Sequence, residues 1–406
     1  MATAPPSHPQ TRPTAPVPAA APARPAVAAR PRDKRGPLAA LLLLLALGGF
    51  VWLAETAFNA YRLQLVVLVL IYAIVAVALA VTSGFTGVFS LGQIGFLAIG
   101  AYVSSLMTIE PIWKDDITLP GLPPWLATMD LTGLHPQVAL LLACLAGGAV
   151  AALVAAVVGA PLMRLSGHYV AVATMGFLII VYTLVVNANS VTSGSRGLSQ
   201  IPGWTTGWSA FGWCALAVYV AWRLRTGPAG RAMIASRENL LAARSIGIDV
   251  LRTRLLAFVV GAFFTGVAGA LLAHQIGTIA PSQFYFDTTF RVVTMVVLGG
   301  MGSITGAVAG AAMMTILPEY LRAVDEGFSF GSVQTGPLYG LSQIVLAVGF
   351  ILVMIFRPSG LFGDRELGLG MLSRRRRNDE ALGSNEAITP DAAPGLLDSV
   401  PEESRD

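Results

Sequence analysis

Long apolar runs recur along this sequence and constrain its fold more than any other feature. Runs of roughly 17–25 predominantly apolar residues are long enough to cross a bilayer as α-helices. With 55% hydrophobic and only 12% charged residues among 406, the chain has more apolar surface than one soluble core could bury. We therefore expect an all-α, polytopic transmembrane helical bundle of about ten spans with broken, glycine-rich helices. The expected spans are 37–54, 63–81, 86–107, 136–160, 168–187, 209–223, 255–274, 287–300, 303–321 and 338–356.

Composition divides the chain into a transmembrane domain and two tails. Residues 1–36 are rich in Pro, Ala and Arg without apolar periodicity, which predicts a disordered tail. The transmembrane domain covers 37–360 and contains a polar, arginine-rich loop at 225–254. Its first run, 37–54, is similar to a secretory signal, but it is long enough to span and we interpret it as a membrane anchor. Residues 361–406 are first basic and then acidic, which predicts a second disordered tail.

The distribution of arginines predicts the topology. With ten spans, both termini, Arg164 and the 225–254 loop fall on one side of the membrane. That side is the cytosol by the positive-inside rule. The opposite side receives mainly acidic residues, namely Glu110, Asp115, Asp116 and Asp130.

The polar loop contains the signals of a short helix. Ser236 is a candidate N-cap, Glu238 would lie in the first turn, and Gly247 can adopt the left-handed conformation that ends a helix. These signals predict a helix over 237–246. Its apolar residues are Leu240, Leu241, Ala243 and Ile246, and its charged residues are Arg237, Glu238 and Arg244. This mixture favours docking on a soluble partner, although a connecting loop lying on lipid headgroups would show the same pattern.

Glycines cluster at two places where helices are expected to end. The first cluster comprises Gly84, Gly87, Gly92, Gly95 and Gly100, and Gly302, Gly306 and Gly310 recur at every fourth residue in the second. Small residues at this spacing allow helix backbones to pack closely, which explains the pattern without any transport role. The alternative is that broken helix ends line a translocation path, where Ser90, Gln93 or Thr305 meet a polar solute.

The span 287–300 is the weakest of the ten. Asp287 and Arg291 lie at its start, and Gly299, Gly300 and Gly302 interrupt its end. We expect a half-helix there.

No catalytic constellation is present in the sequence. The only lysines, Lys34 and Lys114, follow no phosphate-binding glycine motif, so nucleotide must be handled by another subunit. The four histidines are scattered, and Cys144 and Cys214 lie in separate apolar runs without ligand-like neighbours. The basic residues lie at the ends of apolar runs, which argues against a nucleic-acid partner. We therefore expect no enzyme activity and no cofactor on this chain itself.

Several segments resemble a known family. AARSIG at 242–247, followed by IDVLRTRLLAF, resembles the cytosolic coupling loop of ABC importer permeases. The wider RENLLAARSIGIDVLRTRLLAF is similar to permeases for branched-chain amino acids, of the LivM type. SGFTGVFSLGQIGFLAIGAYVSSL, VLGGMGSITGAVAGA and GLSQIP resemble further segments of that family. Leu241 departs from the glutamate that many ABC importers carry before the two alanines, and Glu238 lies three residues earlier.

The resemblance implies a function and a set of partners. It implies a permease subunit of an ATP-driven importer in the bacterial inner membrane, with branched-chain amino acids as its substrates. Its partners would be a second related permease subunit, two cytosolic ABC ATPases carrying the ATP, and an external solute-binding protein.

The resemblance also assigns residues to two roles. The ATPase-coupling residues would be Arg237, Glu238, Leu240, Leu241, Ala242, Ala243, Arg244 and Gly247. The translocation path would include Ser90, Gly92, Gln93, Gly95, Gly300, Gly302 and Thr305.

Three alternatives remain open. Urea or amide permeases have very similar sequences. A stand-alone secondary carrier is disfavoured because such carriers keep ionisable groups near the bilayer midplane, whereas the span centres here are almost bare of them. A structural membrane scaffold is disfavoured by the helix expected in the polar loop.

Overall fold

The computed structural model describes residues 59–114, 129–165, 167–325 and 340–357, together with 48–49, 52, 55–56, 122–123, 329–330, 333–334, 360–361 and 363. Its first helices are α2 (Ala60–Leu79), η1 (Ala80–Gly84), α3 (Gln93–Thr108), η2 (Pro111–Trp113), α5 (Pro136–Leu162), α6 (His168–Asn187), α7 (Asn189–Thr192), η3 (Gly194–Arg196) and α8 (Gly207–Thr226). The later elements are α9 (Pro228–Glu238), α10 (Leu240–Ser245), α11 (Val250–Ile276), η4 (Pro281–Phe284), α12 (Phe286–Gly299), α13 (Ile304–Asp325), β1 (Ser329–Phe330), β2 (Val333–Gln334) and α14 (Leu341–Phe356). The two short strands pair antiparallel, with Ser329 opposite Gln334.

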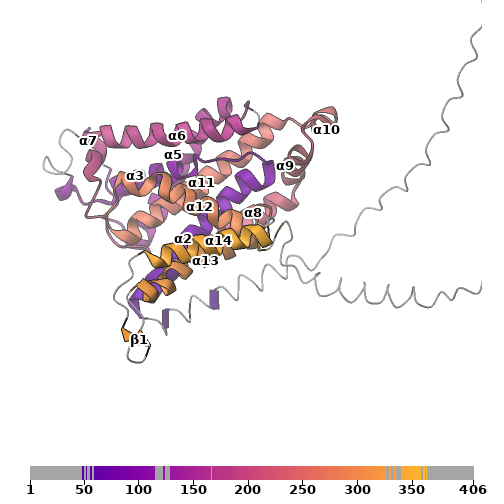
Figure 1. Ribbon diagram of the computed structural model, residues 1–406. Coiled ribbons are helices and arrows are strands. Elements are labelled where there is room, and N and C mark those ends of the chain that lie inside the picture. The colour runs from indigo at the N-terminus through magenta and orange to yellow at the C-terminus, as the bar shows by residue number, and fades with distance from the viewer. Residues whose placement is uncertain are drawn as a thin grey trace, which may run out of the picture.

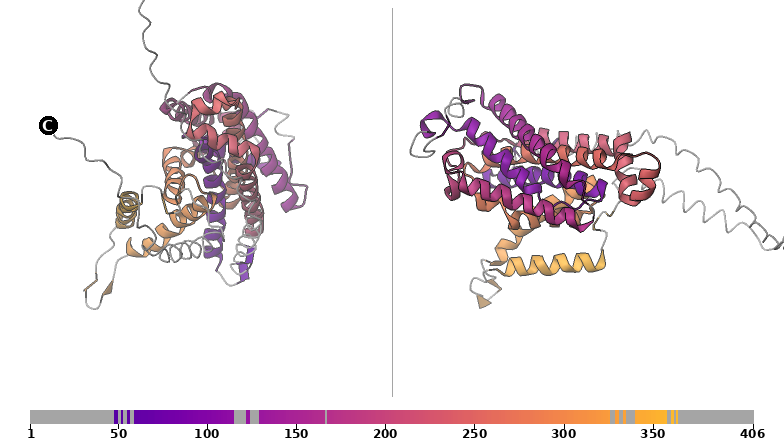
Figure 2. Two further views of the ribbon diagram at one scale, coloured as in Figure 1. Left: turned by 90° about the vertical axis from the view of Figure 1, so that its right-hand side faces the viewer. Right: turned by 90° about the horizontal axis from the view of Figure 1, so that it is seen from above.

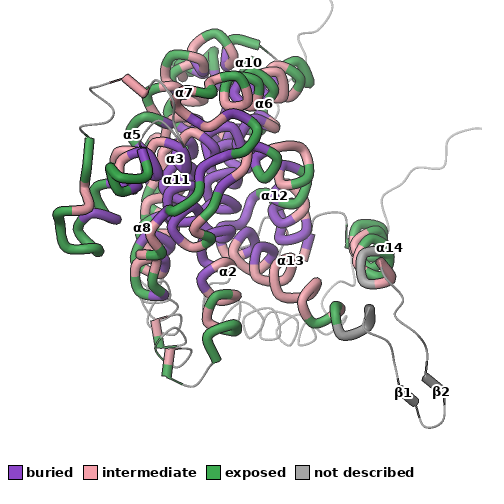
Figure 3. The backbone as a smooth tube through the Cα atoms, turned by 90° about the vertical axis from the view of Figure 1, so that its left-hand side faces the viewer, coloured by how far each residue is buried: buried purple, intermediate pink, exposed green. Residues whose placement is uncertain are grey.

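Helices α2 and α11 form the centre of an all-α bundle, which confirms the expected fold class. α11 packs against α3, α5 and α2, while α2 also packs against α8 and α13. Most residues of α2 and α11 are buried, whereas most of those in α5 and α6 are partly or fully exposed (Figure 3). The exposed residues of α5 and α6 are themselves largely apolar, as expected for helices that face lipid. The protein is therefore a multi-pass membrane protein.

Glycines bring the central backbones into contact. A Cβ atom added at Gly100 of α3 would lie 2.0 Å from the Gly266 carbonyl oxygen of α11. One added at Gly269 would lie 2.0 Å from the Leu97 carbonyl oxygen, and Gly147 of α5 packs on Gly100. Without a strong hydrophobic driving force in lipid, such close packing supplies the association of helices. The packing explanation of the glycine pattern is therefore confirmed at Gly100, and the glycines of α5 and α11 extend the same packing beyond the predicted clusters.

The helices match most of the expected spans. α5 and α6 reproduce 136–160 and 168–187 almost to the residue. Among the described residues, five helices are long and apolar enough to cross a membrane, at Ala60–Gly84, Pro136–Leu162, His168–Asn187, Val250–Ile276 and Ile304–Arg322. Shorter apolar helices lie at Gln93–Thr108 and Ile344–Phe356. The span expected at 37–54 and both predicted tails lie almost entirely outside the described residues.

Different segments of the chain lie at the two ends of the bundle. Figure 1 shows α9 and α10, from the arginine-rich loop, at one end and α7 at the other. At the α7 end, Leu198 of the GLSQIP segment bridges to Ile279, which ties the 188–206 connection to the segment after α11. Lys114 lies on the acidic side, where its Nζ donates to the Met129 carbonyl at 2.7 Å. Burial lowers the pKa of Lys114, and the nearby Asp130 partly offsets that effect.

Helix α14 stands beside the main bundle. Among the described elements it packs mainly against α13 and, less closely, α12. Two further views show it, in yellow, set apart from the other helices (Figure 2). Apolar side chains are exposed around it, including Ile344, Val348, Ile351 and Phe356. Such an exposed apolar surface is typical of a helix that faces lipid.

Candidate functional site

A break between α2 and α3 forms the first part of the site. α2 continues into η1, a π-helix, which is a rare element that often marks functional positions. The Thr82 hydroxyl donates to the Ala78 carbonyl at 3.0 Å, and the backbone then turns at Gly87, whose φ is +70°. Ser90 N donates to the Ser83 hydroxyl at 3.2 Å in place of a helical bond. The span expected from residue 86 is therefore wrong at its start, because α3 begins only at Gln93.

A second break separates α12 from α13. α12 has 14 residues and ends at Gly300, whose φ of +111° an L side chain rarely adopts. Ser303 starts the next helix, since its hydroxyl accepts from Gly306 N at 3.1 Å. The predicted half-helix is confirmed, because 14 residues span only about 21 Å against a hydrocarbon core of about 30 Å.

The two breaks touch each other. A Cβ atom at Gly84 would lie 1.9 Å from the Met301 carbonyl oxygen, so the end of η1 rests directly on the second break. α12 and α13 approach equally closely, since a Cβ at Gly310 would lie 2.0 Å from the Met295 carbonyl oxygen. Gly306 likewise contacts Gly299, so the expected close approach of this glycine face is confirmed at Gly306 and Gly310. Two broken helices are thus joined at one backbone junction.

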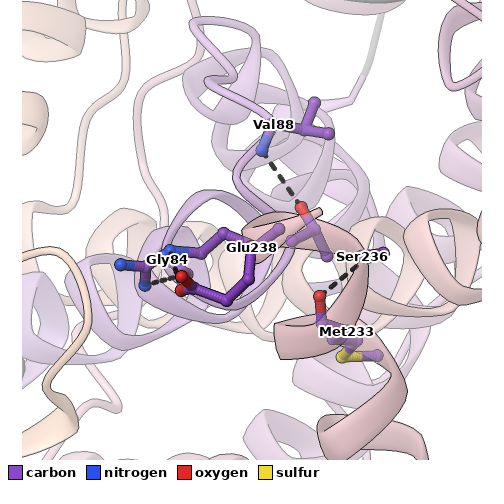
Figure 4. Close-up of polar contacts among 7 residues, drawn as sticks. Gly84, Val88, Met233, Ser236 and Glu238 are labelled. Carbon is purple, nitrogen blue, oxygen red and sulfur yellow. Dashed lines mark hydrogen bonds and ion pairs between the residues drawn. The ribbon is translucent and has the colours of Figure 1, made fainter. Parts of the chain in front are cut away.

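Two arginines of the polar loop hold this junction. Arg237 donates from its Nη1 to the Gly84 carbonyl at 2.8 Å, and Arg225 donates from its Nη1 to the Gly302 carbonyl at 2.8 Å. The Arg225 guanidinium also lies over the Phe85 ring, 5.8 Å from its centroid. Figure 4 shows Glu238 beside Gly84, where it forms an ion pair with Arg237 at 3.7 Å. We call Gly84, Gly302, Arg225 and Arg237 the arginine clasp.

The helix expected over 237–246 is wrong in its bounds. The loop contains two helices instead, with Asn239 between them in an extended conformation. Asn239 is the N-cap of α10, because its Oδ1 accepts from the backbone N–H groups of Leu241 and Ala242, each at 3.0 Å. Pro228 at the first position of α9 starts a helix upstream that runs through the expected cap.

Two residues of the predicted helix therefore have different surroundings from those expected. Ser236 is buried inside α9 and donates to the Met233 carbonyl at 2.7 Å, as Figure 4 shows, so it caps nothing. Glu238 is the last residue of α9 rather than part of a first turn. Gly247 does adopt the left-handed conformation, with φ +83°, as predicted.

Helix α10 presents part of the predicted contact set to solvent. Leu241 and Ile246 are 77% and 73% exposed, and Ala242 and Arg244 are exposed beside them. Ala243 is buried against the chain, and Leu240 is partly buried. The exposed apolar surface of the loop therefore consists of Leu241 and Ile246, not of all four apolar residues that the sequence analysis grouped together.

The predicted path residues fall into two groups. Ser90, Gly92, Gln93 and Gly95 are buried where α3 meets α6 and α11. Gln93 donates from Nε2 to the Thr265 hydroxyl at 2.6 Å, while its Oε1 and the Ser90 hydroxyl have no hydrogen-bond partner among the residues that the structure describes. Gly300, Gly302 and Thr305 form the second break. Gly84, which shortly precedes the first group in the chain, contacts Met301 in the second break and so links the two groups.

Sequence reasoning missed the partners of the two arginines. Arg225 lies 77 residues from Gly302, and no spacing rule connects positions so distant. Arg237 was assigned to partner docking, but its guanidinium faces the chain's own π-helix. The only available signal was that both arginines lie at helix ends, where long side chains can reach uncovered carbonyl groups.

Comparison with known proteins places the chain in a family. Residues 61–355 match the family model described as the branched-chain amino acid transport system permease component. The high-affinity branched-chain amino acid transport system permease protein LivM of Salmonella typhimurium is 31% identical over 346 residues, which is 77% of this chain and 72% of the relative. LivM of Escherichia coli K12 is 31% identical over 328 residues, covering 72% of this chain and 68% of the relative.

A shorter similarity extends to a second kind of permease. LivH of Salmonella typhimurium, a high-affinity branched-chain amino acid transport system permease protein, is 34% identical over 138 residues, which is 34% of this chain and 41% of the relative. No solved structure is significantly similar to the chain. The family match covers most of the transmembrane helices and both helix breaks. The chain therefore belongs to the family of permease components of branched-chain amino acid transport systems.

Proposed function

We propose that this chain is the membrane permease subunit of an ATP-driven importer of branched-chain amino acids in the bacterial inner membrane. Its termini and the 225–254 loop lie in the cytosol. A second related permease subunit, two ABC ATPases and an external solute-binding protein complete the importer. ATP is bound by the ATPases, and this chain holds no cofactor of its own. Family membership and the named function of the LivM relatives support this proposal.

The observation that carries the proposal is the arginine clasp. α10 offers Leu241 and Ile246 to a partner, and the adjoining α9 is hydrogen-bonded to the first helix break through Arg237. Arg225, at the end of α8, makes the matching bond to the second break. A displacement of this loop by closing ATPases therefore acts directly on the ends of η1 and α12. The broken helices then rock and open the path alternately to the two sides.

The test is to place a charge on the exposed apolar surface of α10. Leu241→Asp and Ile246→Asp would put a carboxylate into a desolvated contact, at a cost of several kcal/mol. We expect the ATPases to be lost on co-purification and ATP-dependent leucine uptake to fall at least tenfold. The matched control is Leu165→Asp, because Leu165 is also exposed and lies at the same end of the bundle, in the turn after α5. Normal co-purification and uptake in both α10 variants would show that the loop is only a connector.

A stand-alone carrier is the second candidate, because α12 carries an ion pair between Asp287 and Arg291. Such groups serve proton or sodium coupling in secondary carriers. The purified chain in liposomes should take up no leucine under a proton or sodium gradient when ATPases are absent. Gradient-driven uptake under those conditions would establish the carrier instead.

The substrate is tested separately. Competition of leucine uptake by unlabelled isoleucine, valine and urea separates an amino acid permease from a urea or amide permease of similar sequence. We expect the two branched amino acids to compete and urea to have no effect.

A further inference from the structure

Helix α12 has a polar surface that the described chain leaves partly uncovered. Asp287, Phe290, Arg291 and Thr294 occur at helical spacing on one side of it, and Val292, Met295 and Val296 are buried on the other. The side chains of Asp287 and Arg291 are 85% and 49% exposed, and Phe290 is 55% exposed. Asp287 and Arg291 form an ion pair at 3.6 Å. We call these four residues the α12 face.

The α12 face lies at the depth of the membrane interior. Arg291 precedes the break at Gly300 by nine residues, which places it about 13 Å along the helix from the junction held by the arginine-rich loop. The bilayer hydrocarbon is about 30 Å thick, so this height falls well inside it. Tyr72 supports this placement, because α12 packs against α2 and Arg291 is among the charges that act on the Tyr72 hydroxyl. Tyr72 is the middle residue of the continuous 25-residue span Ala60–Gly84. In the sequence, Asp287 and Arg291 mark only the start of a weak span.

An exposed ion pair at this depth does not face lipid. Charged side chains within a membrane face a bundle interior or a water-filled cavity, because hydrocarbon cannot solvate them. The pair itself is loose, since 3.6 Å is well beyond the 2.7–2.9 Å or so of a charge-assisted hydrogen bond. Both groups therefore retain hydrogen-bonding capacity for a ligand. The other exposed helices at this depth, α5 and α6, present apolar side chains and no comparable pair among the described residues.

We infer that the α12 face lines the substrate passage and binds a zwitterionic amino acid. The Arg291 guanidinium pairs with the α-carboxylate, the Asp287 carboxylate pairs with the α-ammonium, and Phe290 contacts the apolar side chain. The bound zwitterion replaces one internal ion pair by two, so net charge at the site is unchanged. This inference rests on the proposed function and extends it to named residues. It also favours zwitterionic solutes over neutral amides such as urea, which offer no charged group to either residue.

The experiment measures binding and uptake by the assembled transporter with its ATPases. The probes are leucine, leucinamide, which lacks the carboxylate, and 4-methylpentanoate, which lacks the ammonium group. The wild-type complex should bind leucine more tightly than either analogue. Arg291→Gln and Asp287→Asn should each weaken leucine binding about tenfold or more, the usual effect of losing a charge-assisted hydrogen bond. Asp287→Asn should also lose discrimination against 4-methylpentanoate, and Arg291→Gln should lose discrimination against leucinamide.

Two further variants keep the test independent of folding. Arg291→Lys retains the charge but not the two-pronged geometry of guanidinium, so leucine binding should weaken while assembly stays normal. Arg322→Gln is the matched control, because Arg322 forms an i,i+3 ion pair with Glu319 on α13 away from this face. ATP hydrolysis by the Arg291 and Asp287 variants should persist, since neither residue touches the arginine clasp.

The outcomes separate this inference from the proposed function. If the wild-type complex imports no leucine with ATP, the proposed function fails. If the wild type imports leucine and the α12 variants bind and import it normally, the inference alone is overturned. If the variants lose the second permease subunit on purification, Asp287 and Arg291 form a subunit contact, which also overturns the inference.

Discussion

Gly100 shows how a single methyl group can disrupt this bundle. A Cβ at this position would lie 2.0 Å from the backbone oxygen of Gly266, where neither partner has a flexible side chain to move. Overpacking of this kind typically costs about 1–3 kcal/mol, and a clash with backbone falls at the upper end. We therefore expect Gly100→Ala to lower the melting temperature of the detergent-solubilised protein and its yield of monodisperse material.

The matched control lies in α6. Gly176 has nothing within 4 Å of a Cβ atom, so Gly176→Ala makes the same chemical change in open space. Alanine favours a helix interior over glycine by about 0.5–1 kcal/mol, so this variant should be neutral or slightly more stable. Equal melting temperatures for the two variants would contradict the close contact of α3 and α11.

The sequence predicted only some of the helix ends and side-chain contacts in the polar loop. Gly247 was predicted correctly, because a glycine after a helical stretch is the residue that the left-handed end requires. Ser236 was assigned wrongly, because Ser236 and Asn239 are both good N-caps and only the real start of α9 at Pro228 decides between them. The clasp bonds of Arg225 and Arg237 could not be predicted, since their partners are backbone carbonyls that any residue would supply.

Helix α9 connects the proposed ATPase contact to the first helix break. Arg237→Met keeps much of the aliphatic bulk of the side chain but removes the donor to the Gly84 carbonyl. An unsatisfied buried carbonyl costs about 1–3 kcal/mol, which is enough to change the balance between two conformations of the break. We expect Arg237→Met to retain the ATPases and to hydrolyse ATP, but to import several-fold less leucine for each ATP hydrolysed.

Arg231→Met provides the comparison within the same helix. Arg231 is exposed on α9, and the substitution removes an identical charge from the same loop. Its ratio of leucine imported to ATP hydrolysed should equal that of the wild type. A fall of the same size in both variants would mean that loop charge matters and that the clasp does not.

For whole helices, the sequence predicted where they lie along the chain better than which of them make contact. Apolar length located α5, α6 and α11, and the glycines after Val297 identified α12 as short. The start of α3 was missed because residues 87–92 are as apolar as a helix, and only the turn at Gly87 interrupts them. The contact of Gly84 with Met301 joins positions far apart in the chain, so hydropathy carries no information about it.

The orientation of the bundle in the membrane can be tested by labelling exposed positions at its two ends. Leu134 and Leu165 lie at opposite ends of α5, and both are exposed. Cys144 and Cys214 are buried, so an impermeant thiol reagent meets little native background. A cysteine at each leucine position therefore reports the two faces of the membrane across a single helix.

The arginine bias predicts which of the two introduced cysteines an impermeant reagent reaches from outside the cell. Leu165 adjoins Arg164, and its carbonyl accepts from Arg254 of the arginine-rich loop, whereas Leu134 follows the acidic segment that contains Asp130. By the positive-inside rule, Leu134→Cys should be labelled in intact cells and Leu165→Cys only after permeabilisation. Labelling of Leu165→Cys in intact cells would place α10 outside the cell. No cytosolic ATPase could then reach Leu241, and the coupling function proposed for the arginine clasp would be lost with it.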